Sequence, residues 1–321
     1  MPLRLRGILC FFAMIAFTSL SLFARSNHVT PEPDGSASME MRHGVPFVRV
    51  MVEGRGPFVF AVDTGTNNQA IVSPELAEKL RLPVVAQRNL TDLAGTNIQK
   101  VDEVALDSIT LAGEDFHGVR AIVHSSMAGR GAYDGVLGIA FFRDVLLTLD
   151  FPHRRLEVSS ASLLDDSRTI PMRFWQGVPA IFLQLGDVEL EAQIDTGASA
   201  LTLPASVASR QKFEDGIETL GRASTHVNSW PLRGGTLEGS IGMGGYVFQN
   251  PFVVVSERIP VANLGTSTLQ KFVLQFDQRN RLLRLHTNST ELRLDRDTLQ
   301  DGTTPPTGTA MISSQQIAGG Y

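Results

Sequence analysis

The chain has 321 residues, of which 43% are hydrophobic and 19% charged, a composition typical of a globular protein with enough apolar side chains for two ordinary domains or one large one. The 28 Lys and Arg residues against 33 Asp and Glu residues give a net charge of -5, and no long basic run occurs, which argues against a nucleic-acid-binding protein. The single cysteine, Cys10, lies in the apolar N-terminal stretch, so disulfides, thiolate nucleophiles and cysteine-ligated metals are excluded from the folded part.

The N-terminal segment is typical of an export signal. Arg4 and Arg6 precede an apolar run from residue 7 to about residue 22, and Ser19-Leu20-Ser21 forms a small-x-small cleavage motif. We therefore expect residues 1–24 to be a signal peptide, with an uncleaved membrane anchor as the alternative. The cysteine-free remainder favours a bacterial periplasm over a eukaryotic secretory route, so the expected location is periplasmic or secreted.

The next part of the chain contains one block of sequence that occurs twice. Residues 25–40 are polar and rich in Pro, Gly and Ser, which predicts a flexible lead-in, and the fold is expected to begin near Met41. Each copy then opens with Gly-Val-Pro, at residues 44–46 and 177–179, and continues as a strand, a turn and a second strand. Apolar and polar residues alternate over 188–194, which is the period of a half-buried strand.

Both predicted hairpins run directly into the same tripeptide. It is Asp63-Thr64-Gly65 in the first copy and Asp195-Thr196-Gly197 in the second. A short helix is expected after each, and in the first copy Ser73 is its predicted N-cap. The copies end in matching patterns of apolar and polar residues at 134–158 and 261–285.

These boundaries predict the domain organisation. The periodicity lapses at about residues 159–171, between the two copies, and the chain becomes polar and rich in Pro, Gly and Thr from about Glu291. We expect one domain over residues 41–162, a second over 171–290, and a flexible tail over 291–321.

An Asp at the end of each predicted strand offers two carboxylates to one site. If the two halves pack about a pseudo-twofold axis, Asp63 and Asp195 approach to about 3 Å and share one proton, because like charges that close cannot both ionise. The ionised carboxylate can then take a proton from water while the protonated one polarises a carbonyl group. This pattern therefore favours acid–base hydrolysis.

The doubled Asp-Thr-Gly, followed by Thr66 or Ala198 and by the downstream elements Val136-Leu137-Gly138 and Asn263-Leu264-Gly265, resembles the aspartic proteases. The short halves and their common ending are similar to the bacterial retropepsin-like aspartyl proteases, over roughly residues 41–290. The resemblance implies a mostly β fold with two pseudo-twofold-related retropepsin-like (acid protease) β-barrel lobes and short helices.

The same resemblance implies roles for individual residues. Asp63 and Asp195 would be the catalytic pair of an aspartic endopeptidase that needs no cofactor and no metal. Support of the catalytic loops would come from Thr64, Gly65, Thr66, Thr196, Gly197 and Ala198. Flap and substrate contacts would come from Gly95, Thr96, Trp230 and Gly234. The sequence departs from the family pattern at Asn263, where an apolar residue is expected.

The residues after the two glycines suggest which carboxyl group carries the proton. The Thr66 hydroxyl can donate a hydrogen bond to a carboxylate and favour its charged form, whereas Ala198 cannot. On this basis Asp63 is expected to be the ionised partner and Asp195 the protonated one.

The expected partner is a peptide or protein substrate, with no nucleic acid, and with membrane contact only through an uncleaved N-terminal segment. Because both aspartates lie in one chain, a monomer is expected. The alternative is a catalytically inactive retropepsin-like protein that binds peptides or acts as a scaffold in the cell envelope.

Overall fold

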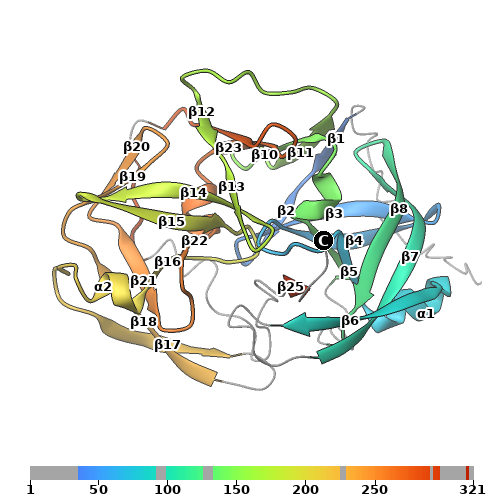
Figure 1. The fold of residues 1–321 in the computed structure, drawn as a ribbon, viewed down its shortest axis with the longest axis horizontal. Coiled ribbons are helices and arrows are strands. Elements are labelled where there is room, and N and C mark those ends of the chain that lie inside the picture. The colour runs from blue at the N-terminus through green and yellow to red at the C-terminus, as the bar shows by residue number, and fades with distance from the viewer. Residues whose placement is uncertain are drawn as a thin grey trace, which may run out of the picture. The chain divides into compact units, whose positions relative to one another are not determined.

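The computed structural model describes residues 35–91, 99–125, 133–224, 229–289, 292–296 and 316–317. The described chain is mostly β, with few and short helices, which confirms the predicted fold class (Figure 1). In this part of the chain no helix is long and apolar enough to cross a membrane. The predicted signal peptide over residues 1–24 lies outside the described residues.

Six strands of the first half form a closed barrel. Each strand pairs with the next and the last pairs with the first, because β3 also pairs with β7. In order around the barrel they are β3 (Val45–Val52), β4 (Arg55–Asp63), β9 (Gly135–Gly138), β5 (Ala70–Val72), β8 (Glu114–Val123) and β7 (Gln99–Leu111). Large side chains such as Phe60, Leu106 and Ile109 fill the interior and are fully buried, which supplies the main driving force for this arrangement.

The second half has strands in a corresponding order, with one interruption. They are β14 (Val178–Leu185), β15 (Val188–Ile194), β22 (Ala262–Leu264), β16 (Leu201–Pro204), β21 (Phe252–Ser256) and β18 (Ser229–Thr236). The chain leaves β18 through residues 237–239 and re-enters the sheet as β19 (Ser240–Met243), which pairs with β14. The two shorter strands β18 and β19 thus occupy the positions that the single long strand β7 has in the first half.

Shorter elements flank these sheets. The strands are β2 (Glu40–Arg42), β6 (Val84–Thr91), β13 (Arg173–Trp175), β17 (Glu218–Ser224) and β20 (Tyr246–Gln249), and the helices are α1 (Pro74–Leu80), the 3-10 helix η2 (Ile139–Phe142), α2 (Ala205–Ala208) and α3 (Thr266–Leu269). The predicted N-cap of α1 is confirmed, because the Ser73 hydroxyl accepts a hydrogen bond of 3.1 Å from the Leu76 N–H.

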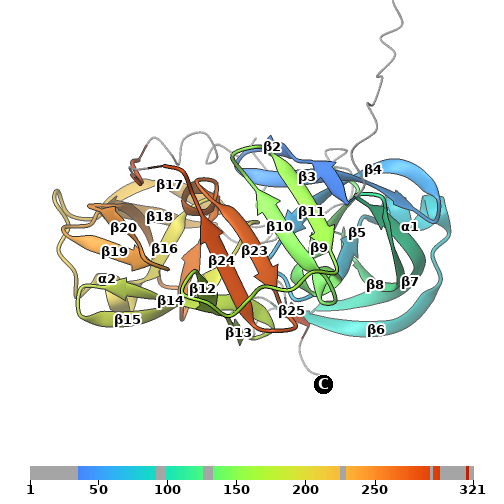
Figure 2. The ribbon, with the colours of Figure 1, turned by 90° about the horizontal axis from the view of Figure 1, so that it is seen from above.

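A third sheet joins the two halves, and Figure 2 shows its central strands side by side. Its order is β1 (Ser36–Ser38), β11 (Arg155–Ser159), β10 (Leu146–Asp150), β23 (Val273–Asp277), β24 (Leu282–His286) and β12 (Thr169–Pro171). At its centre β10 and β23 are antiparallel, with Leu147 opposite Phe276 and Leu149 opposite Leu274. All four side chains are buried in one core cluster that contains residues of both halves.

Two expectations about the chain ends are wrong over part of their length. The predicted flexible lead-in contains β1, which pairs with β11, and the side chains of Ala37 and Met39 are buried in the core. The predicted flexible tail contains Leu294, which is 3% exposed and whose carbonyl accepts from the Phe252 N–H at 2.6 Å. Further on, β25 (Gln316–Ile317) pairs with β6. Local composition is polar in both segments, but Ala37, Met39 and Leu294 are buried against strands distant in sequence.

The connection between the halves is held by a buried carboxylate, Asp277, at the end of β23. It accepts hydrogen bonds from the backbone N–H of Leu163 at 2.9 Å and from the N–H and side chain of Asn280 at 3.1 and 2.8 Å. Burial alone would raise the pKa of Asp277, but these hydrogen bonds and the nearby Arg279 guanidinium hold it below the ordinary value.

We expect Asp277→Asn to lower the free energy of unfolding by about 2 kcal/mol at neutral pH, because hydrogen bonds to a charged group are lost. Since the pKa is lowered in the folded state, this contribution is complete above the ordinary carboxyl pKa and is lost as the pH falls through the folded value. Urea unfolding at pH 7 and pH 3 should therefore show that the wild type and Asp277→Asn differ less in their free energy of unfolding at pH 3. The matched control is Asp150→Asn in β10. The Asp150 side chain accepts a hydrogen bond from the backbone N–H of His153 in its own turn. An equal loss of unfolding free energy in both variants would contradict the account.

Candidate functional site

Asp63 and Asp195 are held at the ends of corresponding strands. Asp63 is the last residue of β4, which pairs in parallel with β9, and Asp195 directly follows β15, which pairs in parallel with β22. The preceding Val62 and Ile194 are completely buried. Each carboxyl group is therefore fixed by a strand that is anchored in the core.

The threonines after the two aspartates bind the two loops to each other. The Thr64 hydroxyl donates to the carbonyl of Ile194 at 2.7 Å and accepts from the Thr196 N–H at 3.1 Å. The Thr196 hydroxyl donates to the carbonyl of Val62 at 2.7 Å and accepts from the Thr64 N–H at 3.0 Å. Both threonines are fully buried. These four reciprocal bonds satisfy both hydroxyl groups and fix the separation of the aspartates.

The glycines bring each carboxyl group against the opposite loop. A Cβ atom on Gly65 would lie 2.3 Å from Cγ of Asp195, and one on Gly197 would lie 2.5 Å from Cγ of Asp63. No side chain larger than hydrogen fits at either position unless the carboxyl groups move. Each glycine N–H also donates to the Asp of its own loop, at 2.8 Å for Asp63 and 2.9 Å for Asp195.

The two carboxyl groups are buried and electrostatically coupled. The side chain of Asp63 is 5% exposed and that of Asp195 is completely buried. Burial first, and then the charge of Asp195, raise the pKa of Asp63 well above its ordinary value. Burial also raises the pKa of Asp195, but a hydrogen bond from Asn263 opposes this rise.

Asn263 contacts the aspartate pair, which the sequence did not predict. Its amide Nδ2 donates to Oδ2 of Asp195 at 2.9 Å, and the Ala198 N–H donates to Oδ1 at 3.1 Å. In the first half, the corresponding strand position holds Val136, which has no polar side chain. The only signal in the sequence was a polar residue at a position where the family pattern has an apolar one.

The carboxamide of Asn263 bears on which carboxyl group carries the proton. The expectation that Asp63 is ionised relied on the Thr66 hydroxyl, which in the structure accepts a hydrogen bond of 2.9 Å from the side chain of Asn68. Because the additional carboxamide donor lies beside Asp195, the arrangement favours the charge on Asp195 and the proton on Asp63.

Of the four predicted flap residues, the structure describes the backbone of Trp230 and the whole of Gly234. Gly95 and Thr96 lie outside the described residues. The backbone of Trp230 lies in β18, opposite Ala223 of β17, and its side chain is not described. Gly234 lies inside the same strand, and a Cβ there would be 2.7 Å from the carbonyl oxygen of Val253, so this glycine allows close packing of β18 on β21.

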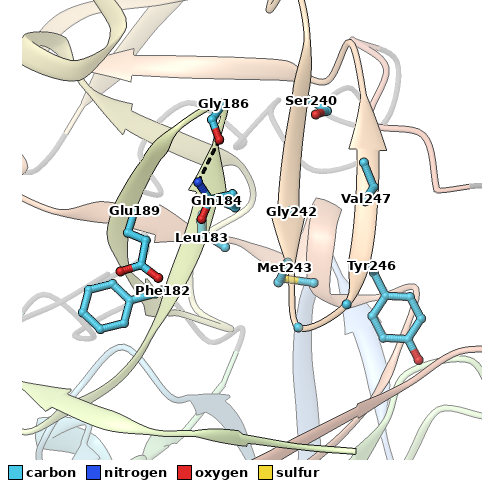
Figure 3. A pocket seen from close by; sticks show the side chains of 12 residues that line it. Phe182, Leu183, Gln184, Gly186, Glu189, Ser240, Gly242, Met243, Tyr246 and Val247 are labelled. Atoms are coloured by element: carbon cyan, nitrogen blue, oxygen red, sulfur yellow. Dashed lines mark hydrogen bonds between the residues drawn. The ribbon is translucent and has the colours of Figure 1, made fainter.

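A surface pocket of about 360 Å³ lies in the second half, away from the aspartates (Figure 3). Its walls come from the β14–β15 hairpin, with Gln184 and Glu189, and from the β19–β20 hairpin, with Met243 and Tyr246. Neither Asp63 nor Asp195 lines it. Across the described ranges, His, Cys, Asp and Glu side chains form no cluster of three or more that could hold a metal ion.

Comparison with protein families gives a match in the first half of the chain. Residues 48–141 match the family model described as Aspartyl protease. The match extends from β3 to η2 and includes Asp63-Thr64-Gly65, and it supports a protease-type function for the chain. No curated protein matches the chain.

Proposed function

We propose that the protein is an aspartic endopeptidase whose two lobes, one from each copy of the repeated sequence, each contribute one carboxyl group. The observation that carries this proposal is the pair of buried aspartates on loops that exchange four hydrogen bonds through Thr64 and Thr196. Two carboxyl groups with raised pKa values, held against each other, are suited to share one proton.

The proposed mechanism divides two roles between the carboxyl groups. Asp195, ionised and stabilised by Asn263, takes a proton from a water molecule that attacks the peptide carbonyl carbon. Asp63, protonated, donates a hydrogen bond to the carbonyl oxygen, where negative charge develops. The tetrahedral intermediate then breaks down as a proton moves to the leaving nitrogen, so no covalent link to the protein forms.

The described structure suggests how an extended peptide could bind. Strand β6 pairs with β7 along one edge and with β25 along the other, where Gln316 lies opposite Thr91 and Ile317 opposite Leu90. The edge of β6 opposite β7 thus accepts an added antiparallel strand from a distant part of the chain. A substrate bound in the same way would gain main-chain hydrogen bonds independent of its sequence, with specificity supplied by side-chain pockets.

Three further proposals follow from the sequence. The signal-like segment supports an exported protein, periplasmic or secreted, with the N-terminal segment as the one route to the membrane. Since one chain carries both aspartates, a monomer suffices for activity. The residues proposed for the reaction include no metal ligand set, so the reaction is proposed to need no cofactor.

A cleavage assay tests the proposed function. Purified residues 26–321 are incubated with a diverse peptide library between about pH 3 and pH 8, and products are identified by mass spectrometry. The proposal requires internal peptide bonds to be cut. If the folded protein binds peptides but cuts none over the whole range, the inactive peptide-binding alternative replaces it.

The role of Asn263 gives a separate prediction. Asn263→Val copies the residue of the first half and removes a hydrogen bond that lowers the pKa of Asp195. We expect the acid limb of the kcat/KM profile to move to higher pH, with kcat/KM at the acid end reduced about tenfold, since a hydrogen bond to a charged group is lost.

A matched control separates this effect from a loss of stability. Asn280→Ala removes another carboxamide that donates to a buried carboxylate, that of Asp277. This control should lower the free energy of unfolding and leave the acid limb unchanged. An unchanged acid limb in Asn263→Val would contradict the assigned role.

A further inference from the structure

A row of side chains beside the aspartates differs in character between the two halves. In the first half the row crosses five neighbouring strands and is entirely apolar. In strand order it consists of Phe47, Ala61, Val136, Ile71 and Ile122, and each of them is paired in register with the next. All five are buried in one small cluster that is distinct from the main core.

The corresponding row in the second half is polar at its centre, and we call it the polar row. The register partners along β14, β15, β22, β16 and β21, whose arrangement is visible in Figure 1, are Ala180, Gln193, Asn263, Thr202 and Val254. Gln193, Asn263 and Thr202 stand where the first half has Ala61, Val136 and Ile71. The two ends of the row are smaller, with Ala180 for Phe47 and Val254 for Ile122.

The polar row lies on the face of the sheet that turns away from the main core. The residues before and after its three central members belong to the main core cluster: Ala192, Ile194, Leu201, Leu203, Ala262 and Leu264. Because side chains alternate between faces along a strand, the polar row points to the opposite side. That side holds the carboxyl group of Asp195, which Asn263 contacts at 2.9 Å.

Two buried atoms of the polar row have no hydrogen-bond partner among the described residues. They are Nε2 of Gln193, a donor, and Oδ1 of Asn263, an acceptor. The Gln193 side chain is only 2% exposed. A buried polar group without a partner costs free energy, and a ligand that supplies the partner recovers it. The first half, with its apolar row, has no such groups at the corresponding positions.

We propose that the polar row is a specificity subsite that binds a neutral carboxamide or hydroxyl side chain of the substrate next to the scissile bond. Such a group accepts from Gln193 and donates to Asn263. An ammonium group has no acceptor for Gln193, and a carboxylate would be repelled by the charge on Asp195. The apolar row, on the Asp63 side, would bind an apolar side chain on the other side of the bond. This inference rests on the proposed endopeptidase function.

The test uses peptide pairs that differ at one residue beside the cleaved bond: Gln against Leu, Gln against Glu, and Thr against Val. For the wild-type protein we expect kcat/KM to be at least about tenfold higher for Gln than for Leu or Glu on one side of the bond, because a site built to form hydrogen bonds rejects analogues that lack them. In Gln193→Leu the Gln-to-Leu ratio should fall to about one or reverse. Thr202→Val, a smaller change in the same row, should lower the Thr-to-Val ratio.

Gln275→Leu is the matched control, because it makes the same substitution in β23 of the joining sheet, where Gln275 donates to Thr148. It should keep the wild-type ratio. Equal ratios in wild type and Gln193→Leu, or a preference for Leu on both sides of the bond, would overturn the subsite.

A binding measurement distinguishes failure of the subsite from failure of the proposed function. If the wild type cuts no peptide, the endopeptidase proposal fails by itself. The same peptide pairs are then measured for binding to Asp63→Asn and to Asp63→Asn with Gln193→Leu. A preference for Gln that disappears in the double variant supports the subsite, and equal binding of Gln and Leu peptides by both variants overturns it.

Discussion

Replacing either aspartate by asparagine should reduce kcat/KM for peptide cleavage by at least about 10³-fold, since general acid–base catalysis contributes on this scale and the two groups act as one unit. Asp195→Asn removes the group that is proposed to take the proton from water. Asp63→Asn removes the group that is proposed to donate to the carbonyl oxygen. The double variant should be little worse than either single one, because each loss already breaks the shared dyad.

Asp63→Asn should raise stability at neutral pH although it lowers activity. Burial raises the folded pKa of Asp63, so this group favours folding at pH values below the ordinary carboxyl pKa, and that contribution is lost as the pH rises through the folded value. At neutral pH Asp63→Asn should therefore melt at a higher temperature than wild type, and near pH 3 the difference should shrink. An inactive variant that melts higher excludes misfolding as the cause of lost activity. Full activity in either variant would refute the dyad.

Gly65→Ala should have the second largest effect. The added methyl group would lie 2.3 Å from Cγ of Asp195, so the carboxyl group or the whole loop must move. Because displacements of about 1 Å can cost about 10²-fold in rate, we expect kcat/KM to fall by at least that factor. Overpacking in this rigid region should also lower the free energy of unfolding by about 1–3 kcal/mol.

Gly118→Ala provides the control for Gly65→Ala. Gly118 has a φ of +65°, and a Cβ there meets no atom within 4 Å, so the substitution adds backbone strain without a clash at the aspartates. It should cost about 1 kcal/mol of stability and leave kcat/KM unchanged. If Gly65→Ala behaves in the same way as this control, the close approach of the two loops does not matter for the reaction.

The sequence predicted those parts of the structure that depend on local patterns. The strand–turn–strand–Asp-Thr-Gly order is written in alternating apolar residues and turn glycines, and Ser73 and Pro74 mark the start of α1. The sequence did not predict contacts between distant segments. Residues 36–38 pair with β11 about 120 positions later in the chain, and no local property of this polar stretch encodes such a partner.

The contact between Asn263 and Asp195 shows the same limit within the site. From the sequence, Asn263 was only a polar interruption of an apolar element. Its meaning depends on the parallel register that sets Asn263 opposite Gln193 and Leu264 opposite Ile194, because this register brings the carboxamide to the Asp195 carboxylate. The comparison of Thr66 with Ala198 considered only residues adjacent in sequence, so it did not take this second donor into account.

The pH dependence of kcat/KM, measured on one cleaved peptide, tests the central claim most directly. A dyad in which one carboxyl group must be ionised and the other protonated predicts a bell-shaped profile. The basic limb should lie well above the ordinary carboxyl range, because burial and the charge of Asp195 raise the pKa of Asp63. A profile that rises continuously to pH 8, or one with a single limb, would contradict a proton shared between Asp63 and Asp195.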